Sequence, residues 1–119
     1  MPATKALSTI IAAATSNTAG STTTGTAVNL TTAYGAFITG LITNGGTGPT
    51  VAATAFIEVS GNNTDWKEAA RMAGDTAANS ITPFSYEVSS GVMYARVRVN
   101  GNTGTAVTCE AFAQALTGI

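Results

Sequence analysis

The sequence predicts an all-β protein, an antiparallel two-layer β-sandwich of immunoglobulin-like or jelly-roll type. About seven to eight segments alternate apolar and polar residues, and they recur at roughly the 8–12-residue spacing typical of sandwiches. The chain also contains 22 Thr and 13 Gly, a mixture that favours strands and turns over helices. At 119 residues the chain can hold one hydrophobic core, so we expect a single sandwich with an extended N-terminal arm.

Residues 91–112 carry the clearest strand signal. Apolar and polar side chains alternate over residues 92–99 and again over 105–112. Between these runs, Asn100-Gly101 tolerates the positive φ angles that a hairpin turn requires. We therefore expect two paired strands with one buried face each. The positions predicted to be buried are Met93, Ala95, Val97, Val99, Val107, Cys109 and Ala111.

The first 26 residues differ in composition from the rest and are interpreted as a separate N-terminal arm, with the sandwich domain spanning residues 27–119. Little in this block beyond Leu7, Ile10 and Ile11 can be buried to offset the entropy of ordering. We expect a neighbouring subunit to hold the arm, with packing along the protein's own sheet as the alternative. The same three residues with Ala14 also fit one face of a short helix.

Strands are expected at residues 27–30, 34–43, 50–60, 66–72 and 81–88. The segment 66–72 contains good helix formers, but the hairpin spacing around it favours a strand. Pro83 lies within the segment 81–88 and marks it as an edge or bulged strand, because proline cannot donate to the ladder.

The composition argues against an enzyme. The chain has no histidine and one cysteine, which excludes the commonest metal clusters and any Cys–His or Ser–His machinery, and we expect no metal or cofactor. Five basic residues scattered along the chain make nucleic-acid binding unexpected. No apolar run approaches the roughly 18 residues of a membrane span. We interpret Cys109 as a buried, inert thiol.

The carboxylates near the middle of the chain do not suggest a catalytic pair. Asp65, Glu68 and Asp75 lie close in sequence to Lys67 and Arg71, so we expect a solvated or salt-bridged surface there.

Arg96 and Arg98 are the most informative charged residues. They share one strand face with Tyr94, and two guanidinium groups about 7 Å apart repel each other unless each has a partner. The first interpretation is pairing with a cross-strand acid, for which Glu110 is the candidate; the second is an anchoring row at a subunit interface. Trp66 also has two interpretations, a lid on the core, which we favour, or a platform that stacks on sugars.

Three segments resemble small β-sandwich virion proteins of tailed bacteriophages. They are residues 59–66 with a polar turn before Trp66, the strand 93–99, and the Asn-Thr-Gly turn within 101–108. The resemblance spans roughly residues 34–116. It implies a role at the virion surface or in capsid stabilisation, and it transfers no catalytic residue.

The resulting hypothesis is a capsid decoration (cement) protein on the exterior of a tailed-phage capsid. Only 9% of residues are charged, which gives a free monomer little protection against association. We expect it to bind the major capsid protein and copies of itself, as a homotrimer, through Leu7, Ile10, Ile11, Tyr94, Arg96 and Arg98. The alternative is a carbohydrate-binding or adhesin module that uses Trp66, Tyr86 or Tyr94.

Overall fold

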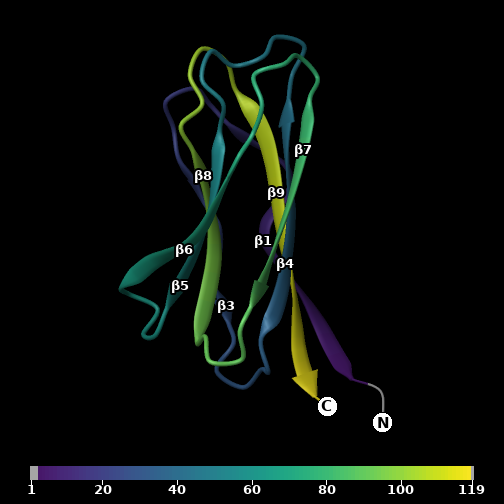
Figure 1. Cartoon of the computed structure of the whole chain (residues 1–119), viewed down its shortest axis with the longest axis vertical. Helices are drawn as coiled ribbons and strands as arrows, with labels where there is room; N and C mark the ends of the chain where they lie inside the picture. The colour runs from purple at the N-terminus through teal and green to yellow at the C-terminus, as the bar shows by residue number, and fades with distance from the viewer. Residues whose placement is uncertain (1–2, 119) are drawn as a thin grey trace.

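The computed structural model describes residues 3–118 and confirms a sandwich of two antiparallel sheets (Figure 1). The first sheet has the strand order β1-β9-β4-β7, and the second has the order β2-β8-β5-β6, with β3 also paired to β8. The strands are β1 (Thr4–Asn17), β2 (Thr23–Thr24), β3 (Val28–Asn29), β4 (Ala36–Asn44), β5 (Thr54–Ser60), β6 (Trp66–Ala73), β7 (Ile81–Val88), β8 (Tyr94–Asn100) and β9 (Val107–Gly118).

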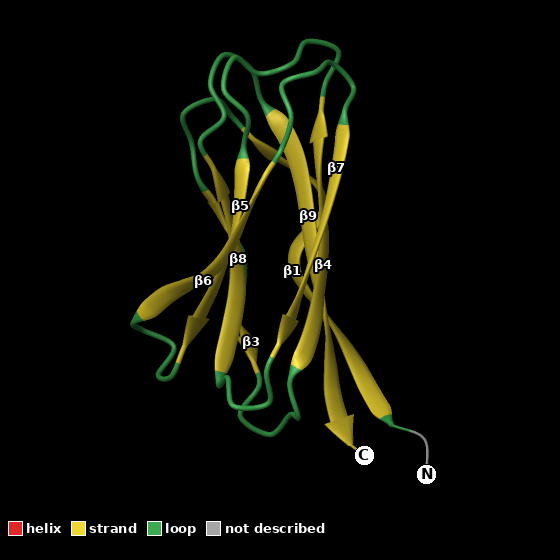
Figure 2. Cartoon of the chain, in the orientation of Figure 1, coloured by secondary structure: helices red, strands yellow, loops and turns green. Residues whose placement is uncertain are grey.

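Strands and loops account for the whole described chain (Figure 2). Within residues 3–118 no helix is long and apolar enough to cross a membrane. The segment 66–72 is confirmed as a strand, and β7, which contains Pro83, is confirmed as an edge strand of the first sheet.

The core lies between the sheets and follows from the alternation of side chains along each strand. In β9 every second residue from Val107 to Ala115 is buried, and most of these side chains are alanine, so the sheets can approach closely. Ile38, Ile57 and Val97 are fully buried between them. On β4, the ring of Phe84 occupies the space that a Cβ atom on Gly40 would need, which explains a glycine in the middle of a strand.

The expected hairpin at residues 91–112 is wrong: β8 and β9 lie in different sheets. β8 pairs with β5, whereas β9 pairs with β1 and β4. The connecting loop crosses between the sheets because Asn102 is fully buried and its Nδ2 donates to the carbonyl oxygens of Asn17 (3.1 Å) and Thr105 (3.0 Å). The predicted buried positions are confirmed except for Met93, which is 44% exposed.

The N-terminal segment differs from the expected separate arm. Thr4–Asn17 form β1, which pairs with β9 along its length. A register shift between Thr9 and Ile11 turns two neighbouring side chains inward, so Ile10 and Ile11 are 3% and 4% exposed. Their burial offsets the entropy of ordering, and the protein's own sheet, the alternative considered above, holds this segment.

The end of β1 is fixed by a buried polar contact. Asn17 is 1% exposed; its Nδ2 donates to Oδ1 of Asn102 (2.6 Å), and its Oδ1 accepts from the hydroxyl of Thr23 (2.7 Å). Because buried amides are costly without partners, this network locks β1 to the loop between β8 and β9.

Candidate functional site

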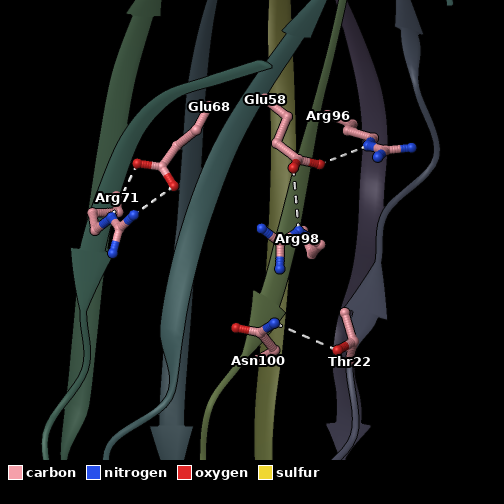
Figure 3. Close-up of polar contacts among 7 residues, drawn as sticks. All are labelled: Thr22, Glu58, Glu68, Arg71, Arg96, Arg98 and Asn100. Carbon is pink, nitrogen blue, oxygen red and sulfur yellow. Dashed lines mark hydrogen bonds and ion pairs between the residues drawn. The ribbon is translucent and has the colours of Figure 1, made fainter. Parts of the chain in front are cut away.

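The outer face of the second sheet carries a row of charged and aromatic side chains, which we call the arginine ladder. Its members are Trp66, Arg96, Glu58, Arg98, Phe56, Arg71 and Glu68. At its centre, Nε of Arg96 donates to Oε1 of Glu58 (2.8 Å) and Nε of Arg98 donates to Oε2 (3.2 Å), as Figure 3 shows. The side chain of Glu58 is 10% exposed, so one largely buried carboxylate serves both guanidinium groups.

The acid that pairs with the two arginines is therefore Glu58, and the prediction of Glu110 is wrong. Glu58 lies directly opposite Arg96 in the β5–β8 register, whereas Glu110 is on β9 in the other sheet. The error follows from the hairpin that the structure does not contain.

Aromatic rings complete the ladder. The guanidinium carbon of Arg96 lies 4.1 Å from the ring centre of Trp66, and that of Arg98 lies 4.3 Å from the ring centre of Phe56. Arg71 lies over Phe56 as well, at 5.1 Å, and Figure 3 shows it paired with Glu68 (2.9 Å). These contacts are cation–π interactions. Each of the three guanidinium groups on this face therefore has both a carboxylate and an aromatic ring as partners within the sheet.

Trp66 is not the core lid that the sequence favoured. It lies half-buried on the outer face of the second sheet, beneath Arg96, opposite Ser60 on β5. Tyr94 begins β8, also opposite Ser60 and half-buried, while Tyr86 packs against the core from β7. The three aromatic residues proposed for sugar binding therefore do not form one exposed platform.

The outer face of the first sheet has a different chemistry, and we call it the apolar face. Its large apolar side chains are Leu7, Phe37, Leu41, Ile81, Pro83, Phe112 and Leu116. Leu7 is 69% exposed, Ile81 60% and Phe37 46%, so this face presents several large apolar side chains to solvent. The charged side chains on the same face are Lys5, Glu87 and Glu110.

Shallow hollows lie along the apolar face. One of about 410 Å³ is lined by residues that include Tyr34, Phe37, Gln114 and Leu116. Another, of about 640 Å³, is bordered by Leu41, Pro83, Glu110 and Phe112 among others. Corrugation of this kind lets a protein surface interlock with a partner.

A third hollow, of about 510 Å³, lies at one end of the second sheet. Val92 and Met93 supply apolar side chains, and Asn62, Asp65 and Lys67 supply polar groups. Asn62 is largely engaged in its own turn, where its Oδ1 accepts from the backbone of Thr64 (2.9 Å) and Asp65 (2.8 Å). Within residues 3–118 no cluster of three His, Cys, Asp or Glu residues could hold a metal ion.

The pKa shifts of Asp75 and Cys109 arise from backbone hydrogen bonds and from burial, respectively. Oδ1 of Asp75 accepts from the backbone N–H groups of Ala77 (3.0 Å) and Thr76 (2.6 Å), which lower its pKa below the usual 3.8. The expected surface pairing is confirmed for Glu68 and Arg71. Cys109 is buried as expected, and burial raises the pKa of its thiol.

The residues predicted to bind a partner lie in three different settings. Leu7 is exposed on the apolar face, Ile10 and Ile11 are in the core, and Arg96 and Arg98 are paired in the arginine ladder.

Sequence reasoning missed Glu58 as the partner of the two arginines and did not identify Phe37 or Phe112 as surface residues. A glutamate inside an otherwise apolar strand was the available signal for Glu58, because a buried carboxylate requires a partner.

In sequence, the chain matches no known family model and no curated protein. In structure, it is similar to a protein of Bacillus endospore appendages described as disulfide-linked pili, with 16% identity, a TM-score of 0.57 and coverage of 100% of this chain and 93% of that one. It is also similar to a chain of the infectious bursal disease virus particle, with 12% identity, a TM-score of 0.62 and coverage of 94% of this chain but only 31% of that one.

A third similar structure is the K3 adhesin domain of Lys-gingipain from Porphyromonas gingivalis W83. The identity is 7%, the TM-score 0.57, and the match covers 83% of this chain and 71% of that domain. Because the identities are so low, these likenesses show a shared sandwich fold.

Proposed function

We propose that the protein is a non-catalytic structural subunit of a virion surface, a capsid decoration (cement) protein of a tailed bacteriophage. The observation that carries the proposal is the contrast between the two outer faces of the sandwich. The arginine ladder has its charges and rings paired within the sheet, as a solvent-facing surface would. The apolar face leaves Leu7, Phe37 and Ile81 open to water.

An exposed apolar sheet favours burial against another protein. Removing apolar surface from water gains roughly 25 cal/mol per Å², and large contiguous apolar patches on a soluble protein mark interaction sites. The low charge of this chain, 9% of residues, adds little repulsion to keep such faces apart. Two of the similar structures come from ordered assemblies, a pilus and a viral particle, which supports an assembly role.

We assign the contact between neighbouring subunits of the assembly to the apolar face, in place of the N-terminal arm. Ile10 and Ile11 are part of the protein's own core, so they are not available to a capsid protein. Leu7 stays accessible at the exposed start of β1 and belongs to the apolar face. Arg96 and Arg98 would point away from the contact, on the opposite side of the sandwich.

The test is to locate the protein on particles. Phage particles from the organism that carries the gene are purified on a density gradient, and their proteins are identified by mass spectrometry. Intact particles are then labelled with gold-conjugated antibodies against this chain. We expect the protein in the particle fraction and gold on intact capsids. Absence from the particles, or labelling only after disruption, would contradict an exterior decoration role.

A second candidate, glycan binding, is favoured by the hollow of about 510 Å³ at the end of the second sheet. Asp65 and Lys67 could bind sugar hydroxyl groups there, and Met93 could contact the apolar face of a ring. This function predicts binding on a glycan array that Asp65→Ala abolishes without a change in melting temperature. An array without any hit would remove this candidate.

A further inference from the structure

We propose that the partner of the apolar face is a second copy of this chain, stacked face to face about a two-fold axis that runs across the strands at the level of Phe112. This inference rests on the proposed function only for the premise that the apolar face is covered in the working protein. The strand register, the charges and the area of the face carry the rest of the argument.

The register places the outward side chains in rows. Across β4 and β9, Phe37 lies opposite Gln114, Thr39 opposite Phe112 and Leu41 opposite Glu110. These three rows are two residues apart along the strands, with the row of Phe112 in the middle.

A two-fold axis across the strands through the middle row stacks each strand on its own copy, running in the opposite direction. The outer two rows then exchange places. Phe37 faces Leu41 of the second copy, Gln114 faces Glu110 of the second copy, and Phe112 faces itself. Apolar side chains therefore meet apolar ones, and an amide that can donate meets a carboxylate, so no like charges come together.

The neighbouring strand fits the same arrangement. On β7, Glu87 lies in the row of Phe37 and Pro83 lies in the row of Leu41. The axis places Glu87 opposite Pro83 of the second copy, so the two Glu87 carboxylates of the pair stay apart. Because β7 is an edge strand, Glu87 lies at the rim of the pair and keeps its contact with water, unlike Glu110 on the inner strand β9.

The other two-fold arrangement, with its axis along the strands, fits less well. It would exchange β9 with β4 within each row, so that Glu110 faces Leu41 and Gln114 faces Phe37. A carboxylate buried against leucine loses its hydration without a partner, which is costly. Stacking on the arginine ladder is disfavoured for a similar reason, because Arg96 and Arg98 already have their acid and would lose water for no new pairing.

The size of the face matches what a specific pair needs. Four strands about 4.8 Å apart make a sheet roughly 19 Å wide, and the nine residues of β4 at about 3.3 Å each make it roughly 30 Å long. The product is about 570 Å² per copy and about 1,100 Å² for the pair, above the roughly 1,000 Å² that separates specific contacts from incidental ones. Two such faces pack about 10 Å apart, with strand directions within about 30°.

The first measurement is the mass of the purified full chain in solution, by sedimentation velocity and light scattering over a range of concentrations. We expect a species of twice the chain mass of 11.8 kDa. Phe37→Lys should give a monomer, because it sets a lysine against leucine in both halves of the pair. Met93→Lys is the matched control, since Met93 is 44% exposed and Phe37 46%, but Met93 lies outside the apolar face. It should remain a dimer.

The second measurement tests the axis itself. Leu41→Glu alone should also be monomeric, whereas a mixture of the Phe37→Lys and Leu41→Glu chains should form a heterodimer. Only the axis across the strands places the new lysine of one chain opposite the new glutamate of the other. Circular dichroism checks that each variant is folded. If a variant is not folded, Gln114→Glu is used in its place. This substitution sets a second carboxylate opposite Glu110 of the other copy, at both symmetry-related positions of the pair, and should weaken dimerisation at least about tenfold.

Three results would overturn the inference: a wild-type chain that is monomeric at every concentration, a trimer, or no heterodimer on mixing folded variants. Failure here is distinct from failure of the proposed function. A monomer found on intact capsids would remove the face-to-face pair and leave the decoration role, whereas a dimer absent from particles would do the reverse.

Discussion

The buried position of Ile10 and Ile11 predicts that the N-terminal strand stabilises the sandwich itself. Each substitution Ile→Ala removes three carbon atoms, worth about 2.4 kcal/mol at roughly 0.8 kcal/mol per buried CH₂ group. A cavity term adds to this, and measured losses for such changes run from about 2 to 5 kcal/mol. Because β1 is an edge strand and can move inward to fill part of the space, we expect about 3 kcal/mol for either Ile10→Ala or Ile11→Ala.

The assay is urea unfolding followed by the fluorescence of Trp66, at a protein concentration low enough for the chain to be monomeric, because Leu7 belongs to the apolar face and its substitution could otherwise also weaken association. With an unfolding slope of about 1.5 kcal/mol per molar urea, a loss of 3 kcal/mol lowers the midpoint by about 2 M. Leu7→Ala is the control on the same strand, since Leu7 is 69% exposed, and it should cost less than about 0.5 kcal/mol. If both isoleucine variants unfold at the wild-type midpoint, β1 does not contribute to the core and the reasoning fails.

Three further predictions concern charged and titratable groups. Glu58→Ala should destabilise the protein by about 1–3 kcal/mol in urea unfolding, because it leaves two guanidinium groups without their acid. The control is Glu68→Ala on the exposed side of the ladder, which should cost at most about 0.5 kcal/mol. Equal losses of stability in the two variants would contradict the central place of Glu58. Asp75 has a lowered pKa in the folded protein, so its carboxylate stabilises the fold at pH values above its ordinary pKa of 3.8. This contribution is lost as the pH falls through the pKa of the folded state. The urea midpoint of Asp75→Asn should therefore depend less on pH in acid than that of the wild type. Cys109 should react with a thiol reagent at neutral pH only as fast as the protein opens, because burial shields it and raises its pKa, and rapid labelling of the native protein would be inconsistent with the structure.

The strands were predictable because alternation is a local signal. The period of two in residues 92–99 and 105–112 correctly identified buried positions such as Val97 and Cys109, since each side chain's orientation depends only on its place along its own strand. Pro83 marked an edge strand for an equally local reason, the missing N–H group.

The pairing of strands was not predictable, because it depends on residues far apart in the chain. Asn100-Gly101 fits a hairpin turn, but Asn102 binds Asn17, 85 residues away, and carries the chain to the other sheet. The partner of Arg96 was missed as a result: the sequence signals that Glu58 needs a partner, but only the β5–β8 register shows that this partner is Arg96. The two consecutive isoleucines of β1 were also misread, because only a register shift lets neighbouring residues point the same way.

The pairing of β1 with β9 has a consequence for how the protein is made. β1 precedes the other described strands in the sequence and pairs with β9, so Thr4 meets Gly118 only after the more than one hundred residues between them have been synthesised. Ile10 and Ile11 must wait for that partner, and pairings over such distances in sequence fold slowly. During synthesis these two side chains are exposed in the nascent chain, which makes them a place for a chaperone to bind before the sandwich closes.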